Sequence, residues 1–354
     1  MNLLFIIGSL KHGGAERQTV IDANYFSGKY NVMVMTFCGG ELEGLLNKNI
    51  KYVVLEKKGY LNASKRLREI LINEKINIVN ASLFASMIIS VIASGKLNIP
   101  VIWFFHSHEY DIELKSKLAF KYFSRKNCLK KIFFVSRELQ RHFSFRRFGF
   151  PAHKEEILYN IYTVNNSNAI KNKNGKITIG YIGRLVALKR IEYLPELAEY
   201  LIKEGITDFR ICILGDGPER VRLEKLAEEK NVSGYIKFEG FQKDVEKYYN
   251  TFDVFALPSQ EECLSISLID ACVKELPSVA FDTGGNNEII VNGKNGYIVN
   301  EKMEFFERVK ELVLDAKKRG EFGRAAREYC LNKFSAAARF EKLENIYNKL
   351  ISEN

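Results

Sequence analysis

Several common signatures are missing from this 354-residue sequence. Its six cysteines are scattered, with no Cys-x-x-Cys pair and no cluster of cysteine and histidine at metal-ligand spacing. There is no Gly-x-Gly-x-x-Gly sequence, so a nicotinamide cofactor is poorly supported, and there is no Asp-x-Asp pair. The scattered cysteines favour a reduced, cytosolic chain, and without an Asp-x-Asp pair no divalent metal clamp is implied.

Long hydrophobic runs are also missing. The longest apolar run, around Leu83 to Ala93, is far shorter than the ~20 residues that a membrane-spanning helix needs. Leu3 to Ile7 is too short for the apolar core of a signal peptide and has no basic residue before it. The sequence therefore predicts a cytoplasmic protein, with any membrane contact peripheral and on the inner face.

The chain is long enough for two domains, and each half shows the same alternation of strand-like and helix-like segments. Strand-like apolar runs alternate with helix-length segments, which is typical of parallel sheets with crossover helices. In the first half we expect strands at Leu3–Ile7, Val32–Thr36, Ile78–Asn80, Val101–Phe105 and Ile132–Val135.

The second half restarts after a polar, asparagine-rich stretch. Residues 166–176 are therefore predicted to link a first domain, 1–165, to a second, 177–335. Here we expect strands at Thr178–Ile182, Arg210–Leu214, Ile236–Phe238, Val254–Leu257 and Ser278–Phe281, and helices near Glu192–Lys203 and Pro218–Lys230. Residues 336–354 have apolar residues at helical spacing and predict a terminal helix. Two doubly wound, Rossmann-like α/β domains would bind ligands in a cleft at the carboxyl ends of their strands.

Glycines follow several of these strands. Gly13 and Gly14 would let the backbone approach a ligand before a helix N-terminus that favours anions, although a plain strand-to-helix turn is the alternative. Gly183 and Gly215 follow the first two strands of the second domain. Phe241 follows a third, either beside a nucleotide base or as a core side chain.

Two cations follow the first strand of the second domain. Arg184 and Lys189 lie five residues apart at its carboxyl end. A guanidinium and an ammonium at that spacing suit two oxygens of one diphosphate. Ordinary surface cations are the alternative interpretation.

The stretch EECLSISLIDACVKELP carries two acids eight positions apart, Glu262 and Asp270. We expect Glu262 in a loop and a helix that begins near Ser265 or Ser267. Asp270 would then either complement the helix dipole or, together with Glu262, accept hydrogen bonds from hydroxyls of a sugar-containing ligand.

Positive charge is concentrated between residues 115 and 147, which hold eleven Lys or Arg and one acid in a chain of net charge +10. A solvated basic face is one interpretation, and a patch facing anionic lipid, at ~1 kcal/mol for each cation near the surface, is the other. Nucleic-acid binding lacks any recognised motif. The candidate residues for the membrane patch are Lys115, Lys117, Lys121, Arg125, Lys126, Lys130 and Lys131.

Taken in order, these stretches resemble a known family. GGAER, GRLVALK, GDGPER, PSQEECLSISLIDA and DTGGNNEII are similar to motifs of the retaining GT-B glycosyltransferases of glycosyltransferase family 4. The resemblance covers nearly the whole chain and includes a final helix that, in that fold, crosses back to the N-terminal domain.

The resemblance implies roles for individual residues. A nucleotide-diphosphate sugar would lie mainly on the second domain, with its diphosphate on Arg184 and Lys189 and its sugar on Glu262 and the backbone of Cys263, Leu264 and Ser265. Asp270 would contact the ribose, although the family usually has Glu there, and Cys263 stands where glycine is common. Phe241 would lie near the base.

A histidine of the first domain completes the expected site. Family members often carry one after a first-domain strand, near the donor sugar and the acceptor. In FFHSHEYD, His106 matches best and His108 is the second choice.

The expected activity is metal-independent hexosyl transfer to a glycan or lipid-linked acceptor, with retention of configuration and no obligatory covalent intermediate. Glu262 would then position the sugar and would not attack it, unlike the nucleophile of a retaining glycosidase. The alternative is a catalytically weak partner subunit that binds a sugar or polypeptide and supports another transferase.

Overall fold

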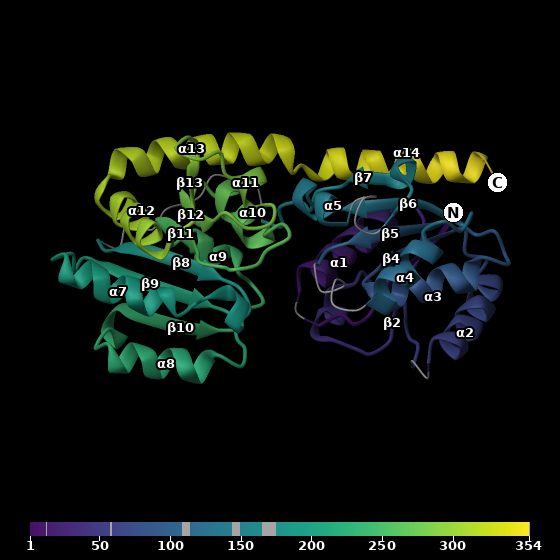
Figure 1. The fold of residues 1–354 in the computed structure, drawn as a ribbon, viewed down its shortest axis with the longest axis horizontal. Coiled ribbons are helices and arrows are strands. Elements are labelled where there is room, and N and C mark those ends of the chain that lie inside the picture. The colour runs from purple at the N-terminus through teal and green to yellow at the C-terminus, as the bar shows by residue number, and fades with distance from the viewer. Residues whose placement is uncertain (12, 57–58, 108–113, 144–148, 165–174, 354) are drawn as a thin grey trace. The chain divides into compact units, whose positions relative to one another are not determined.

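The computed structural model describes the chain except residues 12, 57–58, 108–113, 144–148, 165–174 and 354. Contacts group it into two compact units, Met1–Asn160 with Ala336–Asn354, and Ile161–Ser335. Each unit holds one parallel sheet with helices on its faces (Figure 1), which confirms the prediction of two Rossmann-like domains. Most of the expected linker, 166–176, lies outside the described residues.

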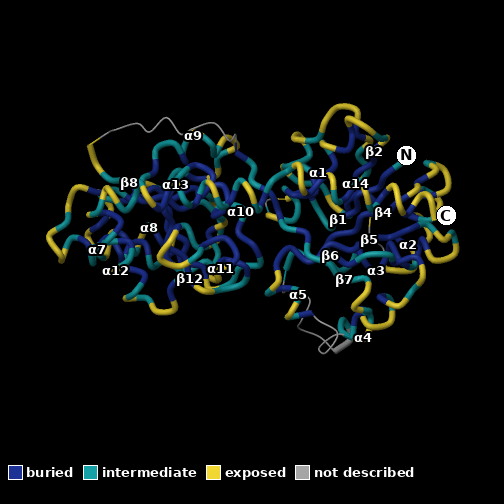
Figure 2. Tube along the Cα trace, turned by 90° about the horizontal axis from the view of Figure 1, so that it is seen from above, coloured by how far each residue is buried: buried dark blue, intermediate teal, exposed yellow. Residues whose placement is uncertain are grey.

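The first unit contains a seven-stranded parallel sheet in the order β3-β2-β1-β4-β5-β6-β7. The strands are β1 (Asn2–Ile7), β2 (Asn31–Thr36), β3 (Lys51–Val54), β4 (Ile78–Ser82), β5 (Val101–Phe105), β6 (Leu129–Phe134) and β7 (Glu155–Ile157). The central strands β4 and β5 are buried at every residue, as expected for a parallel sheet covered on both faces. In Figure 2 the buried colour runs through these strands, and exposed residues gather in the turns around them.

Helices cover both faces of this sheet. They are α1 (Gly14–Ser27), α2 (Tyr60–Asn73), α3 (Phe84–Ser94), α4 (Leu114–Phe123), α5 (Arg137–Phe143) and α14 (Ala336–Ser352). Helices α2, α3 and α4 lie on one side of the sheet in Figure 1 and α14 lies on the other. The final helix of the chain thus completes the first unit.

A buried ion pair fastens α14 to α1. The Arg339 guanidinium donates to both carboxylate oxygens of Asp22, at 2.9 and 2.6 Å, and to the Tyr159 carbonyl at 2.6 Å. Gln18 donates to the same carboxylate at 2.8 Å. Because Arg339 and Asp22 are 4% and 3% exposed, neither has water as a substitute partner.

The second unit contains a six-stranded parallel sheet in the order β10-β9-β8-β11-β12-β13. Its strands are β8 (Ile177–Ile182), β9 (Phe209–Leu214), β10 (Ile236–Gly240), β11 (Val254–Leu257), β12 (Ser278–Phe281) and β13 (Gly296–Val299). Its helices are α7 (Tyr193–Lys203), α8 (Arg220–Glu229), α9 (Glu246–Tyr249), α10 (Ile266–Val273), α11 (Asn286–Ile289), α12 (Lys302–Leu314) and α13 (Ala316–Lys333). The expectation of a helix from Pro218 was wrong by two residues, because a turn precedes α8.

No helix within the described part of the chain has both the length and the apolar composition to cross a membrane.

Removing the Arg339 side chain should destabilise the first unit selectively. Arg339→Leu leaves the Asp22 carboxylate buried without its charge partner, which should cost about 3–5 kcal/mol of unfolding free energy. Trp103, the single tryptophan, is buried in this unit, so urea unfolding followed by its fluorescence isolates the effect.

Lys349→Ala is the matched control, because Lys349 lies on the same helix in an exposed pair with Glu353 and should cost about 0–1 kcal/mol. Equal effects of the two substitutions would show that the buried pair does not fasten α14.

Candidate functional site

The site residues of the second unit lie at one edge of its sheet. Strands β8, β9, β11 and β12 are parallel, so the loops that follow them emerge side by side. The pairing continues beyond the strands, because Gly183 N donates to the Leu214 carbonyl at 3.0 Å and Leu185 N to the Asp216 carbonyl at 3.0 Å. This register brings the GRLVALK loop beside the GDGPER loop.

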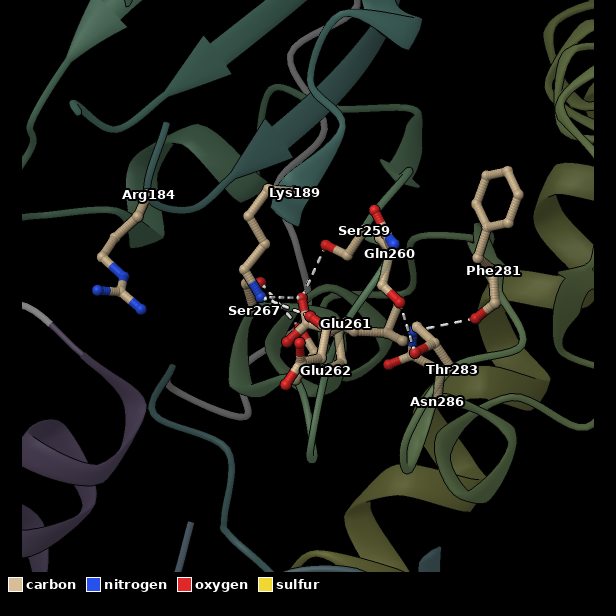
Figure 3. A network of polar contacts seen from close by, with 12 residues as sticks. Arg184, Lys189, Ser259, Gln260, Glu261, Glu262, Ser267, Phe281, Thr283 and Asn286 are labelled. Carbon is tan, nitrogen blue, oxygen red and sulfur yellow. Dashed lines mark hydrogen bonds and ion pairs between the residues drawn. The ribbon is translucent and has the colours of Figure 1, made fainter. Parts of the chain in front are cut away.

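Lys189 ties the loop after β8 to the loop after β11. Its Nζ lies 2.8 Å from Glu262 Oε1 and donates to the Glu261 carbonyl at 3.0 Å (Figure 3). The Lys189 and Glu262 side chains are 18% and 12% exposed, so the pair is largely shielded from water. Nearby, Gln260 N donates to the Leu188 carbonyl at 2.9 Å. Of the predicted residues Arg184, Lys189 and Glu262, the last two are therefore in direct contact.

The Glu262 carboxylate is held at one oxygen only. Ser259 Oγ donates to Oε1 at 2.8 Å, the same oxygen that Lys189 approaches. The other oxygen, Oε2, has no hydrogen-bond partner among the residues that the structure describes. This arrangement orients the carboxylate and leaves Oε2 able to accept a hydrogen bond from a ligand hydroxyl.

Arg184 has a different environment from Lys189. Its side chain is exposed, and its guanidinium makes no hydrogen bond or ion pair with any described residue. Figure 3 shows it apart from the polar contacts of Lys189 and Glu262. The Tyr181 hydroxyl donates to the Arg184 carbonyl at 3.3 Å. Burial, reinforced by the charge of Glu262, holds the pKa of Tyr181 well above its usual value, so this hydroxyl stays a donor. The Arg184 backbone is thus anchored, whereas its guanidinium has no partner among the residues that the structure describes.

The N-terminus of α10 adds backbone donors to the same edge. Ser265 is its N-cap, and its hydroxyl accepts from Leu268 N at 3.3 Å. The N–H groups of Leu264, Ser265 and Ile266 have no acceptor among the described residues. Unpaired N–H groups at a helix N-terminus favour an anion, so this turn complements the two cations.

Two glycines allow these loops to approach each other. Gly284, which follows β12, has φ +52, and a Cβ there would lie 1.6 Å from the Glu262 carbonyl oxygen. Gly215 has φ +128, and its Cβ would lie 1.8 Å from the Gly183 carbonyl oxygen. Both positions require glycine for conformation and for space. Gly13, in contrast, is extended at φ −174 and caps α1 in the first unit with Gly14, so its conformation does not require glycine.

Asp270 lies on the second turn of α10 and is 1% exposed, inside the unit. Thr163 donates to both of its carboxylate oxygens, from the backbone N at 2.5 Å and from Oγ1 at 2.6 Å. These bonds join α10 to the segment that enters the second unit. The predicted contact with a ribose stays a prediction, and it would require Asp270 to share or exchange the Thr163 bonds.

The remaining residues predicted for the second unit lie at the same edge. Phe241 follows β10 and is 45% exposed. Cys263 continues the loop of Glu262, where its carbonyl accepts from Gly285 N at 2.9 Å. The loop after β12 therefore supports the backbone at Cys263, which the family resemblance assigns to binding of the transferred sugar.

His106 follows β5 in the first unit. Its Nδ1 is buried and has no hydrogen-bond partner among the described residues. Burial, with a smaller contribution from the charge of Arg339, lowers the pKa of His106 to about 3. The imidazole is therefore neutral at physiological pH. His108, the second choice, lies outside the described residues.

The structure separates the residues predicted for the membrane patch. Lys121 and Arg125 are exposed on or just after α4, and Lys117 and Lys126 are partly buried there. Lys130 and Lys131 lie on β6, and Lys131 pairs with Glu156 at 3.0 Å. The side chain of Lys115 lies outside the description.

Sequence reasoning missed the residues that hold the site together. Ser259 and Gly284 were present in the quoted motifs, but their contacts with Glu262 depend on the loops meeting in space. Ser259 three residues before Glu262 was a local signal for a turn bond. In the described part of the chain, no three His, Cys, Asp or Glu side chains gather in a way that could hold a metal ion.

A methyl group at Gly284 should disturb the loop of Glu262. Gly284→Ala places Cβ against the Glu262 carbonyl, and overpacking of this kind costs about 1–3 kcal/mol in addition to the strain of positive φ. We expect urea unfolding followed by circular dichroism to shift for the second unit, while Trp103 fluorescence, which reports the first unit, does not change.

Gly293→Ala is the matched control, because Gly293 has φ +72 but no atom within 4 Å of its Cβ position. If both substitutions shift the transition equally, backbone conformation and not the contact with Glu262 is responsible.

The depressed pKa of His106 should make stability depend on pH. The unfolded histidine binds a proton as pH falls below its ordinary pKa of 6.5, whereas the folded form stays neutral down to its pKa of about 3. The free energy of unfolding should therefore fall as pH falls through this window. Between about pH 7.5 and about pH 5.5 this contributes a loss of about 1.4 kcal/mol.

His106→Gln should remove that part of the loss, read from Trp103 fluorescence in urea at the two pH values. Exposed His153→Gln is the control and should leave the wild-type pH dependence in place. An unchanged pH dependence in His106→Gln would contradict the assignment.

Two protein-family models match the chain. Residues 12–164 match the model described as Glycosyltransferase Family 4, and residues 164–329 match the model described as Glycosyl transferases group 1. The matches meet close to the boundary between the two compact units.

Curated relatives carry related names. An uncharacterized glycosyltransferase of Haemophilus influenzae is 27% identical over 327 residues, which are 88% of this chain and 88% of that protein. The poly(ribitol-phosphate) alpha-N-acetylglucosaminyltransferase of Staphylococcus aureus is 31% identical over 196 residues. That match covers 53% of this chain and 40% of the relative's length.

Solved structures share the fold over nearly the whole chain. Anabaena Alr3699/HepE, in complex with UDP and glucose, superposes with a TM-score of 0.86 at 18% identity, covering 99% of this chain and 100% of that chain. The chain therefore has the GT-B fold of glycosyltransferases, its carboxyl-terminal part matches the group 1 domain, and its amino-terminal part is similar to the Family 4 domain.

Proposed function

We propose that this protein is a retaining glycosyltransferase that moves a sugar from a nucleotide-diphosphate donor to a glycan or lipid-linked acceptor. The observation that carries the proposal is the sheet edge where exposed Arg184, the Lys189–Glu262 pair and the N-terminus of α10 occur together. The complex of the structural neighbour with UDP and glucose, and the alpha-N-acetylglucosaminyltransferase among the relatives, support it.

The positive groups are suited to a diphosphate leaving group. Breaking the bond between the sugar carbon and the phosphate oxygen leaves additional negative charge on the diphosphate. Preorganised cations and N–H groups stabilise that charge without having to reorient. Arg184 has no partner among the described residues, Lys189 is held in place by Glu261 and Glu262, and the positive dipole end of α10 would face a bound diphosphate.

Glu262 would position the transferred sugar. Its Oε1 is occupied by Ser259 and Lys189, so Oε2 is the oxygen that would accept from a sugar hydroxyl. An acidic group already paired with an ammonium is a poor nucleophile, which favours same-face attack by the acceptor over a glycosyl-enzyme intermediate. The acceptor oxygen bonds to the sugar carbon, and its proton passes to the departing phosphate oxygen.

Neutral His106 and metal independence complete the proposal. An uncharged imidazole can accept a hydrogen bond from a sugar or acceptor hydroxyl at physiological pH, which a protonated one cannot. Arg184 and Lys189 supply the positive charge that a divalent metal would otherwise supply. We place the reaction at the cytoplasmic face of the membrane, where lipid-linked acceptors are accessible to a peripheral enzyme.

Removal of the Arg184 guanidinium should slow transfer without unfolding the protein. A thermal-shift screen of UDP, GDP and ADP sugars first identifies the donor, because a ligand that binds the folded form raises the melting temperature. With that donor, Arg184→Ala should lower kcat by roughly 10²–10³-fold, and EDTA should have no effect on the unmodified protein.

Lys225→Ala, which removes a highly exposed cation from α8, is the control and should retain full activity. An Arg184→Ala protein as active as the control would contradict the diphosphate role. If the unmodified protein binds a nucleotide sugar but never turns it over, the partner-subunit alternative is favoured instead.

A further inference from the structure

The first unit carries an exposed helix face that its fold does not use. On α4, Leu118 and Tyr122 are 58% and 59% exposed, although both are large apolar or aromatic side chains. Lys121 and the following Arg125 are also exposed. These four residues recur at spacings of three and four, so they form one stripe, which we call the α4 face. The opposite side of the helix is buried, with Phe120 and Ser124 at 0% exposure.

The sequence on and beside this face is rich in cations, of which Lys131 pairs with Glu156. Residues 114–131 contain seven Lys or Arg and no Asp or Glu. Lys126 lies with its Nζ 4.0 Å from the centroid of the Tyr122 ring and donates to its hydroxyl at 2.8 Å. The Arg125 guanidinium donates to the Lys121 carbonyl. Cations and exposed apolar groups are therefore held next to one another.

A cavity adjoins the end of the α4 face. Its volume of ≈ 290 Å³ is sufficient for a phosphate group. Its lining consists of Gly95, Asn98, Arg125, Lys126, Asn127 and Cys128. Arg125 thus belongs to both the stripe and the cavity.

Lys154 holds the backbone of the segment that follows α4. Lys154 Nζ donates to the Ser124 carbonyl at 3.0 Å and to the Lys126 carbonyl at 3.1 Å. These bonds satisfy carbonyl groups at the helix end and add a positive charge where the helix dipole is negative. The cavity wall formed by Arg125, Lys126 and Asn127 therefore has a defined backbone.

We propose that the α4 face docks on an anionic phospholipid membrane and that the adjoining cavity binds one lipid headgroup phosphate. Leu118 and Tyr122 would enter the interfacial region, where an aromatic ring with a polar tip is favoured. Lys121 and Arg125 would contact phosphates, and Asn98 and Asn127 would donate hydrogen bonds from the cavity wall. Charge complementarity with acidic lipid, combined with exposed apolar groups, favours a membrane over a purely charged partner such as nucleic acid.

This docking deepens the proposed function, since it would hold the enzyme beside a lipid-linked acceptor. It nevertheless concerns the first unit alone, and it is tested by binding without any donor or acceptor. Failure of docking would leave the transfer chemistry of the second unit untouched, and loss of transfer in an Arg184 variant would leave docking untouched.

The test is flotation of the full chain with vesicles of phosphatidylglycerol and phosphatidylcholine, compared with phosphatidylcholine alone. We expect binding to the anionic vesicles only. Charge reversal by Lys121→Glu with Arg125→Glu should weaken it by more than the about five-fold per cation that neutralisation would cost. Leu118→Ser with Tyr122→Ser should weaken binding at high salt, where the apolar contribution dominates.

The matched controls lie on α2 of the same unit, whose exposed Lys65, Arg66, Leu61 and Ile72 offer the same kinds of change. Lys65→Glu with Arg66→Glu, and Leu61→Ser with Ile72→Ser, should leave flotation unchanged. Trp103 fluorescence in urea confirms that each variant is folded.

Three results would overturn the proposal: no flotation with anionic vesicles, equal losses for the α2 and α4 variants, or binding that responds to the charge reversals but not to Leu118→Ser with Tyr122→Ser. The last result, accompanied by binding to duplex DNA of similar strength, would identify a general polyanion site.

Discussion

The contacts of Lys189 organise the candidate site. One ammonium group approaches the Glu262 carboxylate and the Glu261 carbonyl, and so joins the loop after β8 to the loop after β11. The loop after β8 contains only one short 3-10 helix, Ala187–Lys189, and both loops must keep defined positions to bind a ligand. A largely shielded ion pair between them fixes that geometry, because separating the pair would leave two partly buried charges uncompensated.

The other residues at this edge of the second sheet either support the Lys189–Glu262 pair or add positive charge beside it. Gly284 and Gly215 remove side chains where backbones meet, and Ser259 orients the Glu262 carboxylate. Arg184 and the α10 N-terminus then add positive potential that no described residue neutralises. The result is a preorganised anion site, which suits a reaction whose main electrostatic demand is stabilisation of a leaving diphosphate.

Much of the fold could be predicted from the sequence, and the errors have a physical pattern. Strands Val101–Phe105, Val254–Leu257 and Ser278–Phe281 were predicted with their observed bounds, because buried parallel strands are continuous apolar runs. Strands β3, β7 and β13 were missed. All three are edge strands of their sheets, and β3 and β7 include Lys51 and Glu155, so their apolar signal is weak.

The site was predictable in its residue types but not in its contacts. Arg184, Lys189 and Glu262 were found because charged residues after parallel strands converge at one edge. That Lys189 would pair with Glu262, while Arg184 would not pair, depends on loop conformations that no local pattern encodes. Asp270 illustrates the same limit, since its bonds with Thr163 join residues more than a hundred positions apart.

The most direct test of the central claim is a structure of the protein with a bound nucleoside diphosphate. The account predicts diphosphate oxygens within hydrogen-bond distance of the Arg184 guanidinium and the Lys189 ammonium, next to the first turn of α10. A diphosphate bound elsewhere, with both cations directed away from it, would contradict the account.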